Sequence, residues 1–134
     1  MSSSQLMFVE LELPIRTYDI DFAGIVSNIV YIRWLEDLRI QMLAQHYLAL
    51  PDLILTGIAP VLVQTEIKYQ RQLTIHDRPI GKMWMVELEN VRCRLAAEIV
   101  DGHNTIASAT QTTIFIDLKT RRPVRIPAAL RDRL

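Results

Sequence analysis

Two carboxylates stand in a segment that could perform hydrolysis. Asp19 and Asp21 lie in a short stretch that ends at Gly24 and directly precedes a long segment with helical spacing. The start of a helix offers unpaired backbone N–H groups and the positive end of the helix dipole. These groups can hold a developing oxyanion, while a nearby carboxylate attacks a carbonyl carbon or activates a water molecule. A thioester suits such a site, because a thiolate leaves readily without help from a histidine.

The same carboxylates also have a purely structural interpretation. Aspartate in a turn before a helix commonly accepts hydrogen bonds from the backbone, and this role fits Asp19 well. The other candidates are few, since His46, His76 and His103 lie far apart and lack the spacing of metal ligands. The glycines form no phosphate-binding loop, and there is no Gly-x-Ser-x-Gly segment. From the residues alone we expect no metal site, and a structural role for Asp21 stays open beside the catalytic one.

Strands and one long helix must position this segment. Alternation of apolar and polar residues predicts strands over residues 8–16, 61–70, 80–89, 91–99 and 105–117. Trp84, Val86 and Leu88 are expected on one face of the third strand. Residues 27–48 carry an apolar helical stripe without Pro or Gly, which predicts one long helix. Residues 51–60 are expected to form a loop or short turn, and the tail 121–134 to be irregular with a helical turn after Pro127.

One helix and about five antiparallel strands predict an α+β fold in which the sheet covers the helix. The 134 residues suit one domain, spanning residues 1–134, with one core. Cys93 lies in an alternating strand and is expected to be a small core residue rather than a nucleophile. A sheet of this size leaves edges exposed, which favours association of copies of the chain.

The charge of the chain is balanced overall but uneven along its length. Fifteen basic and fifteen acidic residues predict neither a nucleic-acid nor a membrane partner. No stretch approaches the ~20 apolar residues of a membrane span, and Met1 to Glu10 shows no signal or transit peptide, so a cytoplasmic protein is expected. Residues 119–134 contain six basic residues and one acidic residue, a net charge of +5. This tail is either a solvated surface or a landing site for an anionic partner.

The segment from Ile15 to Asn28, followed by Tyr31, Trp34-Leu35-Glu36 and Arg39, resembles the signature of the 4-hydroxybenzoyl-CoA thioesterase family. In that family an Asp-x-Asp-x-x-Gly-x-Val turn leads into a long helix that carries Tyr, Glu and Arg at these spacings. The strand order and the chain length fit the family across nearly the whole chain. The resemblance implies the hotdog fold, a curved antiparallel sheet wrapped round one long helix. It also implies a homodimer or a homotetramer built as a dimer of dimers.

The resemblance assigns roles to single positions. Asp21 matches the catalytic carboxylate, Gly24 the turn glycine, and the backbone N–H of Asn28 the oxyanion donor. Bacterial short-chain acyl-CoA thioesterases of the family often have His at the position of Asn28, so a His-assisted mechanism is in doubt here. Asp19 is expected to form the turn, and Tyr31 to lie in the core or in the wall of the substrate site.

Two basic regions are candidates for binding the substrate. Arg92 and Arg94 share one face of a strand, and family members use basic residues near this point to contact the phosphates of coenzyme A. A solvated strand face is the alternative. Residues 121–127 are similar to the end of plant acyl-ACP thioesterases of the methylketone-synthase-2 type, so the basic tail could dock an acidic acyl carrier protein. Glu36 is expected to be structural, paired with Arg39 or Arg33.

The resemblance implies an acyl thioesterase that acts on an acyl-CoA or an acyl-ACP. Coenzyme A or phosphopantetheine would enter as part of the substrate, with no further cofactor. Asp21 would act as nucleophile or as general base. One alternative is a non-catalytic regulatory module that binds acyl thioesters. A hotdog dehydratase is a third interpretation, but such an enzyme needs a His beside the carboxylate, and none lies near Asp21 in the sequence.

Overall fold

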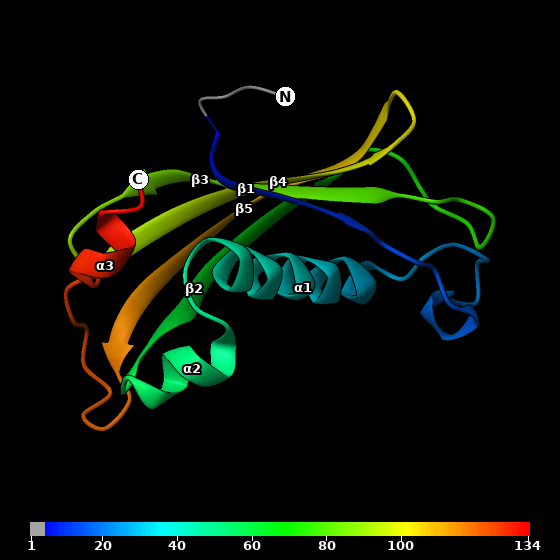
Figure 1. The fold of residues 1–134 in the computed structure, drawn as a ribbon. Coiled ribbons are helices and arrows are strands. Elements are labelled where there is room, and N and C mark those ends of the chain that lie inside the picture. The colour runs from blue at the N-terminus through cyan, green and yellow to red at the C-terminus, as the bar shows by residue number, and fades with distance from the viewer. Residues whose placement is uncertain (1–4) are drawn as a thin grey trace.

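A computed structural model describes residues 5–134, in which one five-stranded antiparallel sheet curves around a long helix (Figure 1). The strands are β1 (Leu6–Glu12), β2 (Ile58–Tyr69), β3 (Ile80–Leu88), β4 (Arg92–Asp101) and β5 (Asn104–Asp117). The helical elements are η1 (Thr17–Asp19), α1 (Asn28–His46), α2 (Leu50–Leu55) and α3 (Ala128–Arg131). The sheet order is β1-β3-β4-β5-β2, which leaves β1 and β2 at the edges. This arrangement confirms the expected hotdog fold.

The predicted helix and strands are close to the observed ones, and the differences have local causes. β1 ends at Glu12 instead of residue 16, because Pro14 lacks the N–H that a strand ladder needs. Residues 50–55 form the short helix α2, with Pro51 in its first turn, where proline is tolerated. The helical turn expected after Pro127 is α3. The first four residues of the segment Met1 to Glu10 lie outside the described part of the chain.

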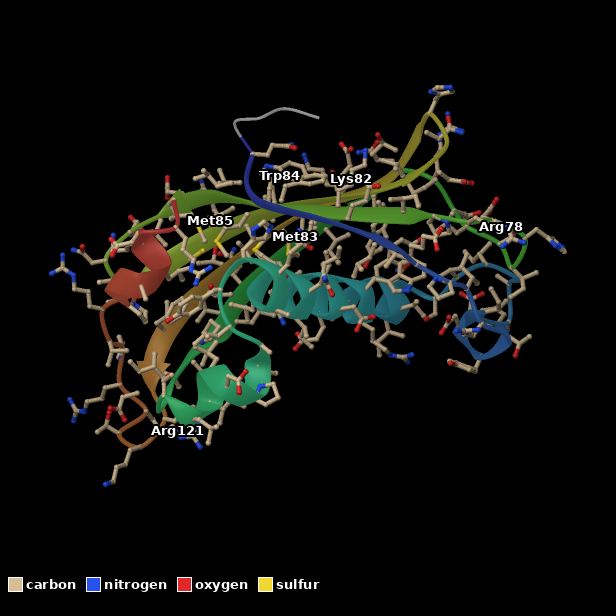
Figure 2. All side chains as sticks on the ribbon, viewed as in Figure 1. Arg78, Lys82, Met83, Trp84, Met85 and Arg121 are labelled. Atoms are coloured by element: carbon tan, nitrogen blue, oxygen red, sulfur yellow. The ribbon has the colours of Figure 1, made fainter. Side chains whose placement is uncertain are left out.

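The inner face of the sheet forms the core together with α1. Met83 and Met85 of β3 point toward the helix, whereas Lys82 and Trp84 point to the opposite face of the sheet (Figure 2). The register of β3 against β4 shifts between Met85 and Glu87. This bulge turns Leu88 back onto the core cluster, so the prediction that it shares a face with Trp84 was wrong.

Close packing places α1 against the β1 and β3 side of the sheet. Gly81 of β3 makes this approach possible, since a Cβ there would lie 2.8 Å from Leu13 Cδ1 and 3.1 Å from Leu38 Cδ1. The far end of the helix is tied to β1, because His46 Nε2 lies 2.7 Å from the backbone oxygen of Phe8. Both contacts fix the direction of α1, and therefore the place where its N-terminus opens. Within residues 5–134, no helix is both long and apolar enough to cross a membrane.

Candidate active site

Asp19 holds the turn that leads into α1. Its carboxylate accepts a hydrogen bond from the N–H of Arg16 at 2.8 Å, and its backbone oxygen accepts one from the N–H of Ser27 at 2.9 Å. The residue is only 5% exposed, and Arg33 Nη1 lies 3.8 Å from its Oδ1. These contacts agree with the expected role of Asp19 as a turn former.

Asp21 lies at the start of a second, tighter turn. Its backbone N–H donates to the oxygen of Ile25 at 2.9 Å, and its backbone oxygen accepts from the N–H of Gly24 at 3.0 Å. Gly24 has a φ of +81°, a left-handed conformation that favours glycine. Asp21 Oδ1 accepts a hydrogen bond from the N–H of Ala23 at 2.8 Å, and Oδ2 lies outside that bond. The carboxylate is therefore oriented by the turn and keeps one oxygen for a ligand.

The first turn of α1 presents backbone donors beside this turn. Ser27 is the N-cap residue, and among the described residues its side chain makes no capping hydrogen bond. The N–H of Val30 donates to the oxygen of Ser27 at 3.0 Å. By helix geometry, the N–H groups of Asn28 and Ile29 have no acceptor inside the helix. The start of α1 can therefore offer two N–H groups and the positive end of its dipole to an oxyanion.

Asp21, Asn28 and Tyr31 line one hollow of about 980 Å³. Three predicted site residues therefore come together at the N-terminal end of α1, and Gly24 shapes the turn next to them. The hollow is also lined by residues of the turn, the β2–β3 connection and the β4–β5 hairpin: Ile25, Val26, Ser27, Tyr69, Gln70, Arg71, Gln72, Asp77, Asp101, Asn104 and Ile106.

Tyr31 forms a buried wall of the hollow. Its ring packs edge-on against Trp34, with centroids 5.3 Å apart, and against Tyr69, with centroids 5.1 Å apart. Burial raises the pKa of the Tyr31 hydroxyl to about 12, and Tyr69 and Asp77 add to the effect. The hydroxyl therefore stays protonated at neutral pH. Tyr69 Oη donates a long hydrogen bond of 3.5 Å to the backbone oxygen of Asn28, which links the end of β2 to the start of α1.

Several residues of the hollow were not singled out from the sequence. Tyr69 and Arg71 reach it because β2 pairs with β5 in a register that puts Tyr69 opposite Ala107. Asp101 and Asn104 reach it because they face each other across the β4–β5 hairpin. Strand register is a tertiary property, and no local signal in the sequence marks these positions. Within residues 5–134, no group of three or more His, Cys, Asp or Glu side chains is placed to hold a metal ion.

Arg92 and Arg94 lie outside the hollow that Asp21 lines. Both are exposed, whereas Cys93 between them is buried in the core, so the two arginines share the face of the sheet opposite α1. Arg94 Nη2 lies 3.7 Å from Glu87 Oε2 and lines a separate shallow hollow on that face. A single chain does not bring either arginine into the Asp21 hollow. Their role in binding a phosphate stays a prediction.

A polar network links α1 to β5 and to the edge strand β2. Arg39 forms an ion pair with Glu36, as expected, and its Nη1 donates to Gln111 Oε1 at 3.4 Å. Gln111 is 2% exposed and donates through Nε2 to Thr65 Oγ1 at 3.0 Å. Burial lowers the pKa of Arg39. An apolar cavity of about 90 Å³ adjoins Glu36 and Arg39 and reaches Cys93, whose thiol is buried as predicted.

The sequence is similar to those of known thioesterases. The family model of the thioesterase-like superfamily matches residues 15–134. The chloroplastic acyl-acyl carrier protein thioesterase ATL3 of Arabidopsis thaliana is 26% identical over 128 residues, which cover 94% of this chain and 67% of the plant protein.

Two solved structures are similar in fold. The DHNA-CoA thioesterase of Staphylococcus aureus has a TM-score of 0.85 at 18% identity, over 93% of this chain and 85% of that protein. A 1,4-dihydroxy-2-naphthoyl-CoA thioesterase from Synechocystis also has a TM-score of 0.85, at 20% identity and over 94% of each chain. Since the family model covers nearly all of the sequence and the sheet and helix follow the hotdog arrangement, the chain belongs to the thioesterase-like superfamily.

Proposed function

We propose that the chain is an acyl thioesterase that hydrolyses an acyl-CoA or acyl-ACP thioester to a free acid and a thiol. One observation carries the proposal: the carboxylate of Asp21 and the start of α1 line the same hollow. Membership of the thioesterase-like superfamily supports thioester hydrolysis in general. The coenzyme A or phosphopantetheine belongs to the substrate, and the proposal needs no other cofactor and no metal.

The proposed reaction uses the two sides of the hollow differently. The thioester carbonyl oxygen would accept hydrogen bonds from backbone N–H groups at Asn28, which stabilise the negative charge that develops on it. Asp21 would then act in one of two ways. As a nucleophile it forms a mixed anhydride and expels the thiolate, and water hydrolyses the anhydride. As a general base it takes a proton from a water molecule that attacks the carbonyl carbon.

Other residues would bind the substrate. Tyr31 is proposed as part of the wall beside the acyl group, because it lines the hollow and its ring is held by two aromatic neighbours. Arg92 and Arg94 are proposed to bind phosphates of coenzyme A. Their exposure and common face support this role, although their site would have to be completed by another copy of the chain.

A homodimer is proposed as the smallest assembly, with a homotetramer as the larger one. β2 is an edge strand on which Val61, Leu62 and Val63 are 37%, 37% and 52% exposed. Unpaired edges with apolar side chains favour pairing with a second chain. The flank of α1 adds further exposed apolar residues: Ile29, Ile32 and Ile40. The cytoplasmic location expected from the sequence remains part of this proposal.

The test compares wild type with Asp21→Asn on a panel of acyl thioesters and measures the release of free thiol. The amide oxygen of Asn can keep the hydrogen bond from the N–H of Ala23, so the turn should persist. We expect kcat to fall by about 10²–10⁴-fold, the usual contribution of a positioned base. Asp37→Asn, an exposed change on α1, is the matched control and should keep full activity.

Two results would contradict the proposal. Equal rates for wild type and Asp21→Asn would remove Asp21 from the mechanism. Tight binding of acyl thioesters without turnover by wild type would favour a regulatory binding module instead.

A further inference from the structure

We propose that the basic loop of residues 117–125, together with the neighbouring end of α2, is a docking surface for an acidic carrier protein that presents an acyl thioester. The inference rests on the proposed thioesterase function and chooses between its two substrate forms. Charge, local order, exposed apolar neighbours and position relative to β2 all support it.

The loop holds its cations in an ordered frame. Asp117 Oδ1 accepts hydrogen bonds from the N–H groups of Lys119 at 2.8 Å and Thr120 at 2.9 Å. These bonds, led by the one from Thr120, lower the pKa of the Asp117 carboxyl. The backbone closes around them, since the N–H of Arg121 donates to Asp117 O at 2.7 Å and the N–H of Asp117 donates to Arg122 O at 2.9 Å. The side chains of the loop therefore project from a fixed turn.

The chain after the loop is anchored in the core. The N–H of Val124 donates to Phe115 O at 2.8 Å, and the N–H of Ile126 donates to Asn90 O at 2.8 Å. Ile126 is 1% exposed, whereas Arg125 beside it is exposed. Arg125 therefore extends the basic surface of the loop along a segment that cannot move far from the sheet.

Apart from Asp117 within the loop, no acidic side chain among the described residues pairs with the loop cations. The ion pairs among residues 5–134 are Asp19–Arg33, Glu36–Arg39 and Glu87–Arg94, and none of them uses Lys119, Arg121, Arg122 or Arg125. Residues 117–125 contain four basic residues and one acidic residue, a net charge of +3, which attracts an acidic partner.

Apolar side chains lie next to these charges. The N–H of Leu118 donates to Gly57 O at 2.9 Å, which holds the loop against the end of α2. Ile54 and Leu55 of α2 are 49% and 84% exposed there, and Arg121 lies at the same end of α2 (Figure 2). An apolar centre with a basic rim suits an amphipathic acidic helix, because the apolar contacts add affinity and the charges set orientation.

The position of the loop matches the proposed dimer. Within one chain, the loop bonds to Gly57 just before β2, whereas Tyr69 at the other end of β2 lines the Asp21 hollow. Two β2 edges that pair antiparallel about a twofold axis place the Ile58 end of one strand beside the Tyr69 end of the other. The basic loop of one copy then borders the Asp21 hollow of the second copy. A carrier protein docked on the loop would deliver its acyl thioester across this interface.

The experiment compares two triple variants that change the same three positions. One variant removes the positive charges and the other keeps them. One is Lys119→Gln, Arg122→Gln and Arg125→Gln; the other is Lys119→Arg, Arg122→Lys and Arg125→Lys. Arg121 is left unchanged because its φ of +64° lies in the left-handed region, where residue types differ in how readily they are accommodated. The substrates are a dodecanoyl carrier protein, dodecanoyl-CoA and the uncharged thioester dodecanoyl-N-acetylcysteamine. The readout is kcat/KM for each, at low and high salt.

We expect the neutral triple variant to lower the ratio of kcat/KM for the carrier protein to kcat/KM for the uncharged thioester about tenfold at low salt. The charge-conserving variant should keep the wild-type ratio, and high salt should reduce the difference between the variants. Lys82 points to the face of the sheet opposite α1. Lys82→Gln should therefore leave kcat/KM unchanged for both the carrier protein and the uncharged thioester. An unchanged ratio would overturn the proposal, and so would an equal loss with dodecanoyl-CoA, which would assign the loop to the phosphates of coenzyme A.

A binding measurement separates this proposal from the proposed function. Fluorescence anisotropy of a labelled holo carrier protein with the Asp21→Asn variant needs no turnover. If wild type hydrolysed no thioester while the carrier protein still bound in a charge-dependent way, the proposed hydrolysis would be contradicted and the proposed docking surface would be supported. If wild type hydrolysed small thioesters but the carrier protein bound both triple variants equally, only the docking surface would fall.

Discussion

The backbone oxygen of Asp19 accepts a hydrogen bond from the N–H of Ser27 at 2.9 Å, so the turn before α1 closes onto the first residue before the helix. Asp21 lies inside the loop that this bond closes. The backbone of Asp21 is therefore tied to the helix start. Asp19 therefore holds the turn that carries the proposed nucleophile or base beside the proposed oxyanion donors at Asn28, and we propose no chemical role for Asp19 itself.

Asp19→Ala keeps this backbone hydrogen bond, but the loss of the carboxylate should still affect both stability and activity. The change removes the acceptor for the N–H of Arg16 and the partner of Arg33 at a buried position. Leaving the Arg16 N–H without an acceptor should lower the free energy of unfolding by about 1–3 kcal/mol, measured by urea denaturation. It should also lower kcat, because the turn holding Asp21 loosens. Asp37→Ala on the exposed face of α1 is the comparison, and an Asp19 variant as stable as this one would contradict the argument.

Gly24→Ala and Gly57→Ala form a matched pair. Both glycines have left-handed φ values, +81° and +84°, and a Cβ at either position would meet nothing within 4 Å. Each substitution should therefore cost about 1–2 kcal/mol of unfolding free energy through backbone strain alone. Only Gly24 shapes the turn that holds Asp21, so only Gly24→Ala should lower kcat on a small uncharged thioester. Equal kcat values for the two variants would show that the Asp21 turn tolerates distortion.

Much of the fold could be predicted because its elements follow regular periods. The helical stripe of residues 27–48 predicts α1 to within two residues at each end, and period-two alternation predicts β4, with Cys93 facing the core. The six residues of α2 are too few to show a helical period. The bulge between Met85 and Glu87 depends on how β3 meets β4, which local alternation does not encode.

The candidate site also contains residues that could be predicted from the sequence and residues that could not. Asp21 and Asn28 could be named as candidates because both lie in one continuous segment that resembles the signature of a known family. Tyr69 and Arg71 join them only through the pairing of β2 with β5, and Asp101 only through the β4–β5 hairpin. A hollow assembled from three distant segments leaves no spacing in the sequence from which it could be recognised.

The edge of β2 offers a direct test of the proposed dimer. Val63 is 52% exposed and lies near the middle of the strand, so in a symmetric antiparallel pair it would lie close to its own copy. Val63→Glu should place two like charges at this contact and convert the dimer into a 15.5 kDa monomer in sedimentation velocity. Ile75→Glu in the β2–β3 connection, 39% exposed, should leave the dimer intact. A wild-type monomer, or a dimer unaffected by Val63→Glu, would remove β2 from the interface.

Because the thiol of Cys93 is buried, we expect the protein to lose stability at high pH. Burial raises its pKa from the ordinary 9.0 to about 12, so the folded chain keeps the proton that the unfolded chain loses above pH 9. The unfolded state then binds fewer protons, and the free energy of unfolding should fall by about 1.4 kcal/mol for each pH unit between pH 9 and 12. Cys93→Ala should show a shallower decline when urea denaturation is followed from pH 8 to pH 10, below the range where Tyr31 contributes. Parallel slopes for the two proteins would mean that the thiol already ionises in the folded state, and Cys93 should then react with a thiol reagent without unfolding.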